Sequence, residues 1–168
     1  MITRYSQVLH APVITLDEQE NLGVVSDIVL NKTDFIIKAF VIRTMPIIPI
    51  RKVISFSDVV EIASNAILVQ NNDAISEMRD SIRVKEAIKA KAHGIGQRVY
   101  TKSGKFIGVV YDYTIHGETG KVIKLYVKTW LSDRLIGTET IFKVEGRKII
   151  IKDEFETIAN KNRQVETA

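Results

Sequence analysis

The sequence offers few residues of the types that catalyse reactions or bind metals. It contains no cysteine, which excludes a thiolate ligand, a cysteine nucleophile and a disulfide framework. The three histidines, His10, His93 and His116, are far apart and in none of the spacings that let imidazoles share a zinc ion. None has a neighbour suited to general acid–base chemistry. We therefore expect no catalytic residue, no metal and no cofactor, and we expect alanine at all three histidines to leave folding and binding intact.

Three short segments superficially match known motifs. Residues 117–121, Gly-Glu-Thr-Gly-Lys, are too short for a phosphate-binding loop, and the pattern after them is that of a strand rather than a helix. They are typical of a hairpin turn. Residues 94–96, Gly-Ile-Gly, are typical of a linker, and residues 31–33, which fit a glycosylation acceptor, of a further turn.

Composition points to an ordinary globular protein. The 168 residues are 45% hydrophobic and 26% charged, and no apolar run approaches the roughly 18–20 residues of a membrane span. The first residues lack the apolar core of a secretory signal. We expect a cytoplasmic protein without a membrane span, built from one medium domain or two small ones.

An internal repeat organises the chain. Residues 22–30 align with residues 107–115 at an offset of 85, with four of nine positions identical. Two further pairs of segments keep the same order. Before the first pair, residues 13–16 align with 98–101 at that offset; after it, residues 38–41 align with 124–127 once one residue is inserted. Three segments kept in order indicate a duplicated domain.

Both repeats have the alternating pattern of β-strands. Expected strands are residues 11–16, 22–30, 35–43, 52–56, 59–62 and 66–70, then 106–115, 122–128, 140–144 and 148–152. Short strands with frequent turns predict a mainly β fold, with a small barrel or sandwich in each repeat. The second repeat carries seven aromatic residues, most at alternating strand positions, which predicts that most of them pack in its core: Tyr100, Phe106, Tyr111, Tyr113, Tyr126, Trp130 and Phe142.

Between the repeats, helical periodicity replaces alternation. Ile75, Met78, Ile82 and Ile88 recur near helical spacing, and the sequence predicts one helix that joins the two barrels by its apolar face. A helix that binds a separate partner is the alternative. The expected organisation is residues 1–71 for the first repeat, 72–94 for the helix and linker, 95–156 for the second repeat and 157–168 for a polar tail.

Charge is unevenly distributed along the chain. Residues 96–152 hold eleven Lys or Arg against five Asp or Glu, whereas residues 1–70 hold six against seven. Such a basic half is typical either of a nucleic-acid surface or of a lysine-rich solvent face on strands. The spread of the lysines along the sequence favours the solvent face.

One motif occurs in both repeats and resembles a known family. The pattern (Leu/Ile)-Gly-x-Val-x-Asp, with Gly23 and Asp27 in the first copy and Gly108 and Asp112 in the second, is similar to the PRC-barrel domain. That domain occurs in the H subunit of photosynthetic reaction centres, in RimM-type ribosome-maturation factors and in many small bacterial and archaeal proteins. The resemblance implies a prokaryotic protein with two small barrels that dock onto partners rather than catalyse. The glycines suit a bend or bulge of a barrel strand, and the aspartates suit a structural role as acceptors of nearby hydrogen bonds.

The chain departs from both named relatives. It has no transmembrane helix like that of the H subunit, and both halves resemble PRC domains, whereas RimM-type factors carry a different N-terminal barrel. We therefore expect a non-catalytic adaptor that binds another protein or a second copy of itself. The alternative is an RNA- or ribosome-associated module that uses the basic second repeat.

Large apolar residues mark the candidate partner interface. They lie in the same connection of both repeats: Met45, Pro46, Ile47, Ile48 and Pro49 in the first, Trp130 and Leu131 in the second. Exposed apolar loops of this kind are typical of interfaces. In the alternative interpretation, each loop folds over its own barrel as a lid.

Overall fold

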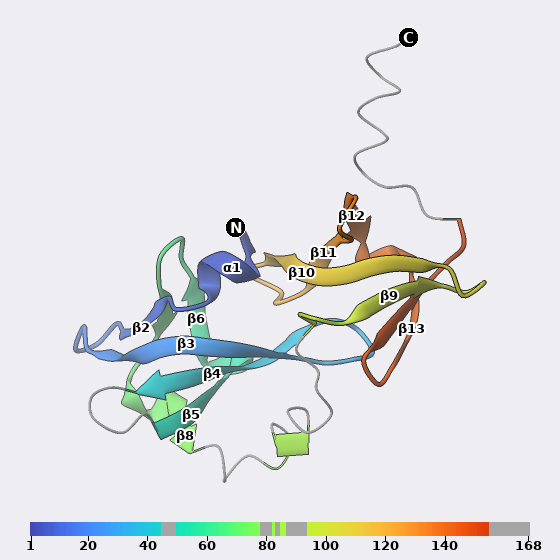
Figure 1. The fold of residues 1–168 in the computed structure, drawn as a ribbon. Coiled ribbons are helices and arrows are strands. Elements are labelled where there is room, and N and C mark those ends of the chain that lie inside the picture. Colours follow the sequence, from blue (N-terminus) through green and yellow to red (C-terminus); the bar gives the residue numbers. More distant parts are fainter. Residues whose placement is uncertain (45–49, 78–81, 83–84, 87–93, 155–168) are drawn as a thin grey trace, which may run out of the picture. The chain divides into compact units, whose positions relative to one another are not determined.

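The computed structural model describes residues 1–44, 50–77, 82, 85–86 and 94–154, and these are mainly β-strands (Figure 1). They form two compact units. Unit 1 consists of Met1–His93 together with Ile115–Lys121, and unit 2 of Gly94–Thr114 together with Val122–Ala168. The cut after His93 lies close to the expected end of the linker, but the transfer of Ile115–Lys121 to unit 1 was not expected from the sequence.

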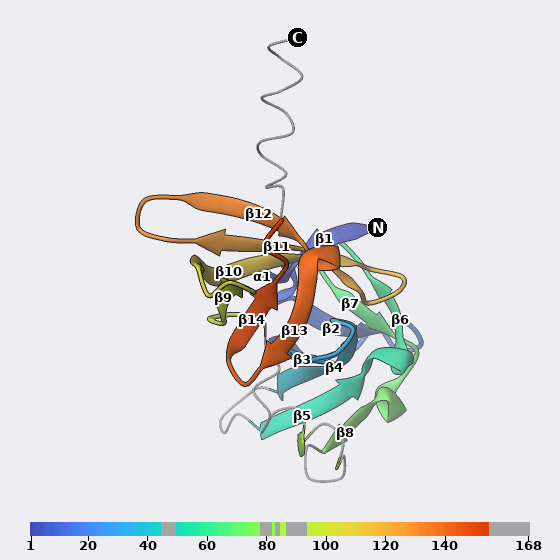
Figure 2. The same ribbon diagram turned by 90° about the vertical axis from the view of Figure 1, so that its right-hand side faces the viewer.

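Unit 1 is built on one strongly curved sheet (Figure 2). Its strand order is β6-β7-β2-β3-β4-β5-β8. The strands are β2 (Pro12–Thr15), β3 (Asn21–Leu30), β4 (Ile37–Thr44), β5 (Ile50–Ser55), β6 (Val59–Ile62), β7 (Ile67–Val69) and β8 (Ile75–Glu77). Neighbours are antiparallel except β2 and β7, which run parallel. The core includes the buried cluster Val29, Ala39, Val41 and Val53.

Short elements complete unit 1. They are β1 (Ile2–Arg4), the helix α1 (Tyr5–Val8) and the 3-10 turns η1 (Phe56–Asp58) and η2 (Asn72–Ala74).

Unit 2 repeats the strand order of unit 1. Its sheet runs β12-β11-β10-β9-β14-β13, and again one pair, β9 and β14, is parallel. The elements are β9 (Arg98–Thr101), β10 (Phe106–His116), β11 (Val122–Lys128), β12 (Asp133–Gly137), η3 (Thr138–Thr140), β13 (Ile141–Glu145) and β14 (Lys148–Ile151). Each strand from β9 to β14 therefore has a counterpart from β2 to β7.

Strand pairing corrects the alignment of the two repeats by one residue. Val13 lies opposite Gly23 and Val99 lies opposite Gly108, so Val13 is the counterpart of Val99 rather than of Arg98. The reason is the turn that follows: the Thr15 amide donates to the carbonyl of Glu20, whereas the Thr101 amide donates to that of Lys105, one residue sooner. An ungapped comparison cannot detect this difference in turn length.

The inserted residue expected before β4 is absent. Gly23 lies against Ile42 and Gly108 against Val127, so the offset of 85 continues through β4 and β11.

The predicted connecting helix is wrong at its start. Ile75–Glu77 is strand β8, which pairs with β5 through Ile54 opposite Ile75 and Lys52 opposite Glu77. Pairing satisfies backbone groups along an otherwise open side of β5, and this outweighs the local helical periodicity. Further along, Ile82, Lys85 and Glu86 are helical, and Ile82 is 71% exposed rather than docked. Met78, Ile88 and residues 157–168 lie outside the described residues.

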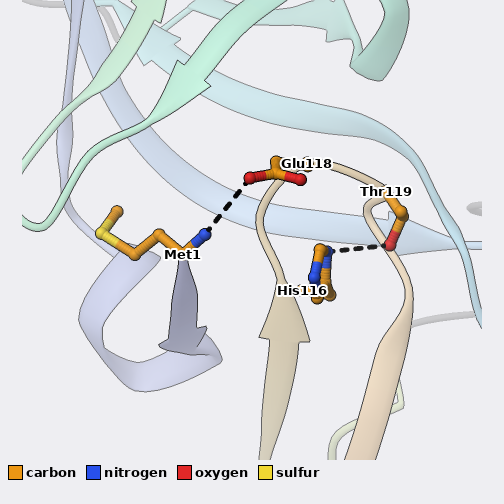
Figure 3. A network of polar contacts seen from close by, with 4 residues as sticks. All are labelled: Met1, His116, Glu118 and Thr119. Carbon is orange, nitrogen blue, oxygen red and sulfur yellow. Dashed lines mark hydrogen bonds and ion pairs between the residues drawn. The ribbon is translucent and has the colours of Figure 1, made fainter.

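The segment Ile115–Lys121 is tied to unit 1 by backbone contacts. The Ile37 amide donates to the Gly120 carbonyl at 2.9 Å, and Ile36 forms a β-bridge with Lys121. The Gly117 amide donates to the Met1 carbonyl at 2.8 Å, while the Met1 ammonium lies 3.8 Å from the Glu118 carboxylate (Figure 3). Unit 1 is therefore completed by a turn that comes late in the sequence.

Candidate interaction surface

The shared glycine places two strands in unusually close contact. A Cβ on Gly23 would lie 2.5 Å from the Arg43 carbonyl oxygen, and one on Gly108 would lie 2.7 Å from that of Lys128. Their φ angles, +133° and +149°, are ones that residues with a side chain rarely adopt. Only glycine fits here, which explains why the motif contains it in both units.

The shared aspartate supports a shift in strand pairing. Oδ1 of Asp27 accepts the Ile28 amide at 2.8 Å, and Oδ1 of Asp112 accepts the Tyr113 amide at 2.9 Å. The pairing of β3 with β4 slips between Val25 and Asp27, so an amide near the slip needs a side-chain acceptor. Beyond this point alternation of burial ends, because Ile28, Val29 and Leu30 are all buried.

On unit 2, cross-strand pairs bring basic and aromatic residues to one face. Lys148 pairs with Arg98 and Arg98 with Val109, while Tyr100 pairs with Phe106. Residues directly opposite each other share a face, and positions two apart along a strand do as well. Every residue on this face is at least partly exposed: Lys148, Arg98, Val109, Tyr100 and Phe106. Lys148 and Arg98 form a basic row, and Tyr100 and Phe106 form an aromatic row beside it.

A hollow of about 530 Å³ opens on this face. It is lined by Phe106, Val109, Lys128, Thr129 and Trp130. Apolar side chains dominate the lining. A hollow of this size can accept one or two apolar side chains of a partner.

The connection from β11 to β12 presents its apolar residues outward. The Thr129 hydroxyl accepts the amides of Leu131 and Ser132 at 3.3 and 3.1 Å, and the Thr129 amide donates to the Ser132 carbonyl at 2.8 Å. These bonds fix the turn, yet Trp130 is 91% and Leu131 75% exposed. At these two residues the connection is not a lid on its own barrel.

Lysine side chains lie over several of the aromatic rings. Lys128 Nζ is 4.9 Å from the ring centre of Tyr111, and Lys148 Nζ is 5.6 Å from that of Tyr100. These separations are within the range of cation–π attraction. We name Arg98, Tyr100, Phe106, Val109, Tyr111, Lys128, Trp130 and Lys148 the aromatic–lysine face.

The expectation that most aromatics of the second repeat pack in its core is wrong. Only Tyr113 of the seven is buried, at 0% exposure, and Phe106 and Phe142 are 46% and 52% exposed. Periodicity alone could not distinguish the two faces, because aliphatic residues of the same strands already fill the core: Val99, Ile107, Val110, Leu125, Val127, Ile149 and Ile151 are all buried.

Other residues singled out in the sequence lie elsewhere. Residues 45–49 and His93 are outside the described residues. His10 precedes β2 in a left-handed conformation, with φ of 69°. His116 ends β10, and its Nδ1 lies 3.2 Å from the Thr119 hydroxyl (Figure 3). Within the described part of the chain, no three His, Asp or Glu side chains are grouped as a metal site would require.

Two comparisons with known proteins bear on this architecture. Residues 95–157 match the PRC-barrel domain family, so this part of the chain carries a PRC-barrel domain. A search of curated proteins finds none that matches the chain. Among the described residues, no helix combines the length and apolar character needed to cross a bilayer.

Proposed function

We propose that this protein is a non-catalytic docking protein that binds another protein through the aromatic–lysine face of unit 2. The observation that carries the proposal is Trp130, which a hydrogen-bonded turn holds 91% exposed beside an apolar hollow. An indole left in water at this position gives up the free energy of burial, and aromatic anchors beside pockets are typical of interface hot spots.

We further propose that unit 1 is a second PRC barrel, so that the chain contains two in tandem. The shared strand order, the parallel pair in each sheet and the paired Gly and Asp positions support this. The duplication leaves one barrel as scaffold and frees the other to change its surface.

Affinity capture from native lysate, with quantitative mass spectrometry, tests the docking proposal. Trp130→Ala and Leu131→Asp should each reduce recovery of a specific partner at least about fivefold, with the melting temperature within about 2 °C of the parent, because exposed residues contribute little to folding. Ile47→Asp and Ile48→Asp make comparable substitutions in the equivalent connection of unit 1, and the same two measurements are made on them for comparison with the unit 2 variants. Unchanged recovery with Trp130→Ala and Leu131→Asp would refute docking at this face.

A further inference from the structure

We infer that the partner segment is an extended acidic peptide that places an apolar side chain in the hollow beside Trp130. This inference rests on the proposed docking function and specifies the chemistry of its ligand.

The hollow selects for an apolar side chain. Phe106 and Val109 line it from β10, and Trp130 lines it from the connection between β11 and β12. Phe106 is 46% exposed and packs against Tyr100 with ring centres 5.3 Å apart, which holds it in place for a ligand. A partner Leu or Phe would bury apolar area on at least three side chains at once.

Basic residues at the hollow and on the neighbouring strands favour negative charge in a partner. Lys128 lines it, and Arg98 and Lys148 extend the basic row across the two neighbouring strands. Strands lie about 4.8 Å apart, a spacing that lets carboxylates of a peptide crossing the strands meet successive cations. Charge complementarity of this kind favours acidic partners and speeds association.

The counterpart face of unit 1 lacks this chemistry. Strand pairing makes Asn21 the counterpart of Phe106 and Pro12 the counterpart of Arg98. Ala66, one residue before β7, takes the place of Lys148. Only Lys128 has a cationic counterpart, Arg43. Because the same scaffold folds without them, these basic and aromatic residues are not required by the barrel.

The same face favours a peptide over single-stranded nucleic acid. Stacking of bases needs open ring faces. Lys148 and Lys128 lie over Tyr100 and Tyr111, and the Tyr111 ring meets that of Tyr126 edge-on at 6.0 Å. The rings are therefore packed against lysines and against one another, and Trp130 is the most open of them.

Fluorescence anisotropy with a labelled ten-residue peptide, Glu residues around a central Phe-Leu, tests the inference on the full-length protein. We expect saturable binding that weakens severalfold between 0.05 and 0.5 M NaCl, since surface charge pairs are screened by salt. The chain has a single tryptophan, so a blue shift of its emission on binding reports contact at Trp130 itself.

The counterpart positions in unit 1 supply both the substitution at Phe106 and a control position, Arg43. Phe106→Asn, which installs the residue of unit 1, should weaken peptide binding about tenfold, and the double variant Lys128→Glu/Lys148→Glu should weaken it at least as much. Arg43→Glu, a charge reversal of equal size on unit 1, should leave affinity unchanged. A peptide with Lys in place of Glu should fail to bind.

Three outcomes with a binding-competent protein would overturn the inference. They are equal binding of the Lys and Glu peptides, an Arg43→Glu effect as large as that of the double variant, and preference for a ten-nucleotide poly(U) RNA with steep salt dependence. If no peptide binds but Trp130→Ala still abolishes capture of a partner, the acidic-peptide inference fails while the docking function stands.

Discussion

The two units share a scaffold and differ in what they expose. In unit 1 the aromatic residues Phe35 and Phe40 are 5% and 0% exposed, whereas in unit 2 Phe106 and Trp130 are 46% and 91% exposed. Unit 1 instead opens a polar hollow of about 140 Å³, lined by Thr15, Asp17, Glu18, Asn71, Asn72 and Asp73.

Where two copies of a scaffold are compared within one chain, the positions they share report what the fold requires. Gly23 with Gly108 and Asp27 with Asp112 are of this kind. The positions at which they differ report residues that the fold does not require, and several of these, such as Phe106 and Arg98, lie on the aromatic–lysine face. The comparison therefore separates residues that the scaffold requires from residues that it does not, without reference to any other protein.

The strongest test of the comparison is to express the N-terminal part of unit 1 without the rest of the chain. A fragment of residues 1–93 lacks Ile115–Lys121, so Ile37 loses its acceptor and Phe56 loses the backbone of Gly120 that packs on its ring. We expect a loss of about 3 kcal/mol, which lowers the melting temperature by roughly 12–24 °C for a small domain. Thermal unfolding followed by circular dichroism measures this, and a fragment that melts as high as the full chain would contradict it.

The shared glycines should be equally intolerant of substitution. Gly23→Ala and Gly108→Ala should each reduce the free energy of unfolding by about 3 kcal/mol, because the new Cβ meets a carbonyl oxygen at an unfavourable φ. Gly104→Ala is the control, since φ is +89° there but a Cβ would meet no atom within 4 Å. It should lose only about 1 kcal/mol in denaturant titrations. Equal losses at Gly104 and Gly108 would show that the close strand contact is unimportant.

The shared aspartates should contribute unequally to the free energy of unfolding. Asp112 is 5% exposed, whereas Asp27 is only half-buried. Asp112→Ala leaves the buried Tyr113 amide without this acceptor and should destabilise by about 2 kcal/mol, more than Asp27→Ala. Asp112→Asn keeps an acceptor and should recover part of the loss. Urea unfolding of the three variants decides the order.

The smallest expected effect concerns pH and Asp153, which stands two residues beyond β14, where unit 1 has Asn71 two residues beyond β7. The Ser103 amide donates to the Asp153 carboxylate at 2.8 Å, and this bond, with the Ser103 hydroxyl and nearby Lys102, lowers the pKa of Asp153. A lowered pKa stabilises the fold above the usual value, and the contribution is lost as pH falls through the lowered one. Asp153→Asn should therefore melt slightly below the parent at pH 7, and the gap should close in acid. A gap that persists at pH 2 would assign it to something other than ionisation.

Much of the β fold could be predicted from the sequence. Alternation located β6 and β11 to the residue, and most other predicted strands within one or two residues, because their apolar positions face one core. Strand β12 was missed, since Asp133–Gly137 is short and lacks clear alternation. Strand β8 was missed because its identity depends on a distant partner, β5, and local periodicity carries no information about that partner.

The candidate surface was only partly predictable. Trp130 and Leu131 stand out by composition in a connection between strands, and both are exposed. The aromatic–lysine face was not predicted, because alternation along one strand shows which residues share a side but neither which side faces the core nor which residues of the next strand lie beside them. Which side faces the core depends on which opposite positions hold enough aliphatic volume to fill it.

The division of the chain also has a consequence for the order of folding during synthesis. Domains generally fold as they emerge from the ribosome, N-terminal part first. Unit 1 cannot be completed in this way, because its last segment, Ile115–Lys121, emerges only after β9 and most of β10 have been translated. At 5–20 residues per second, the roughly 28 residues from Gly94 to Lys121 take about 1.5–6 seconds. During that interval the Phe56 ring and the Ile37 amide lack their contacts with Gly120. The nascent chain can therefore bind chaperones, or pair prematurely with another chain, until residue 121 has emerged.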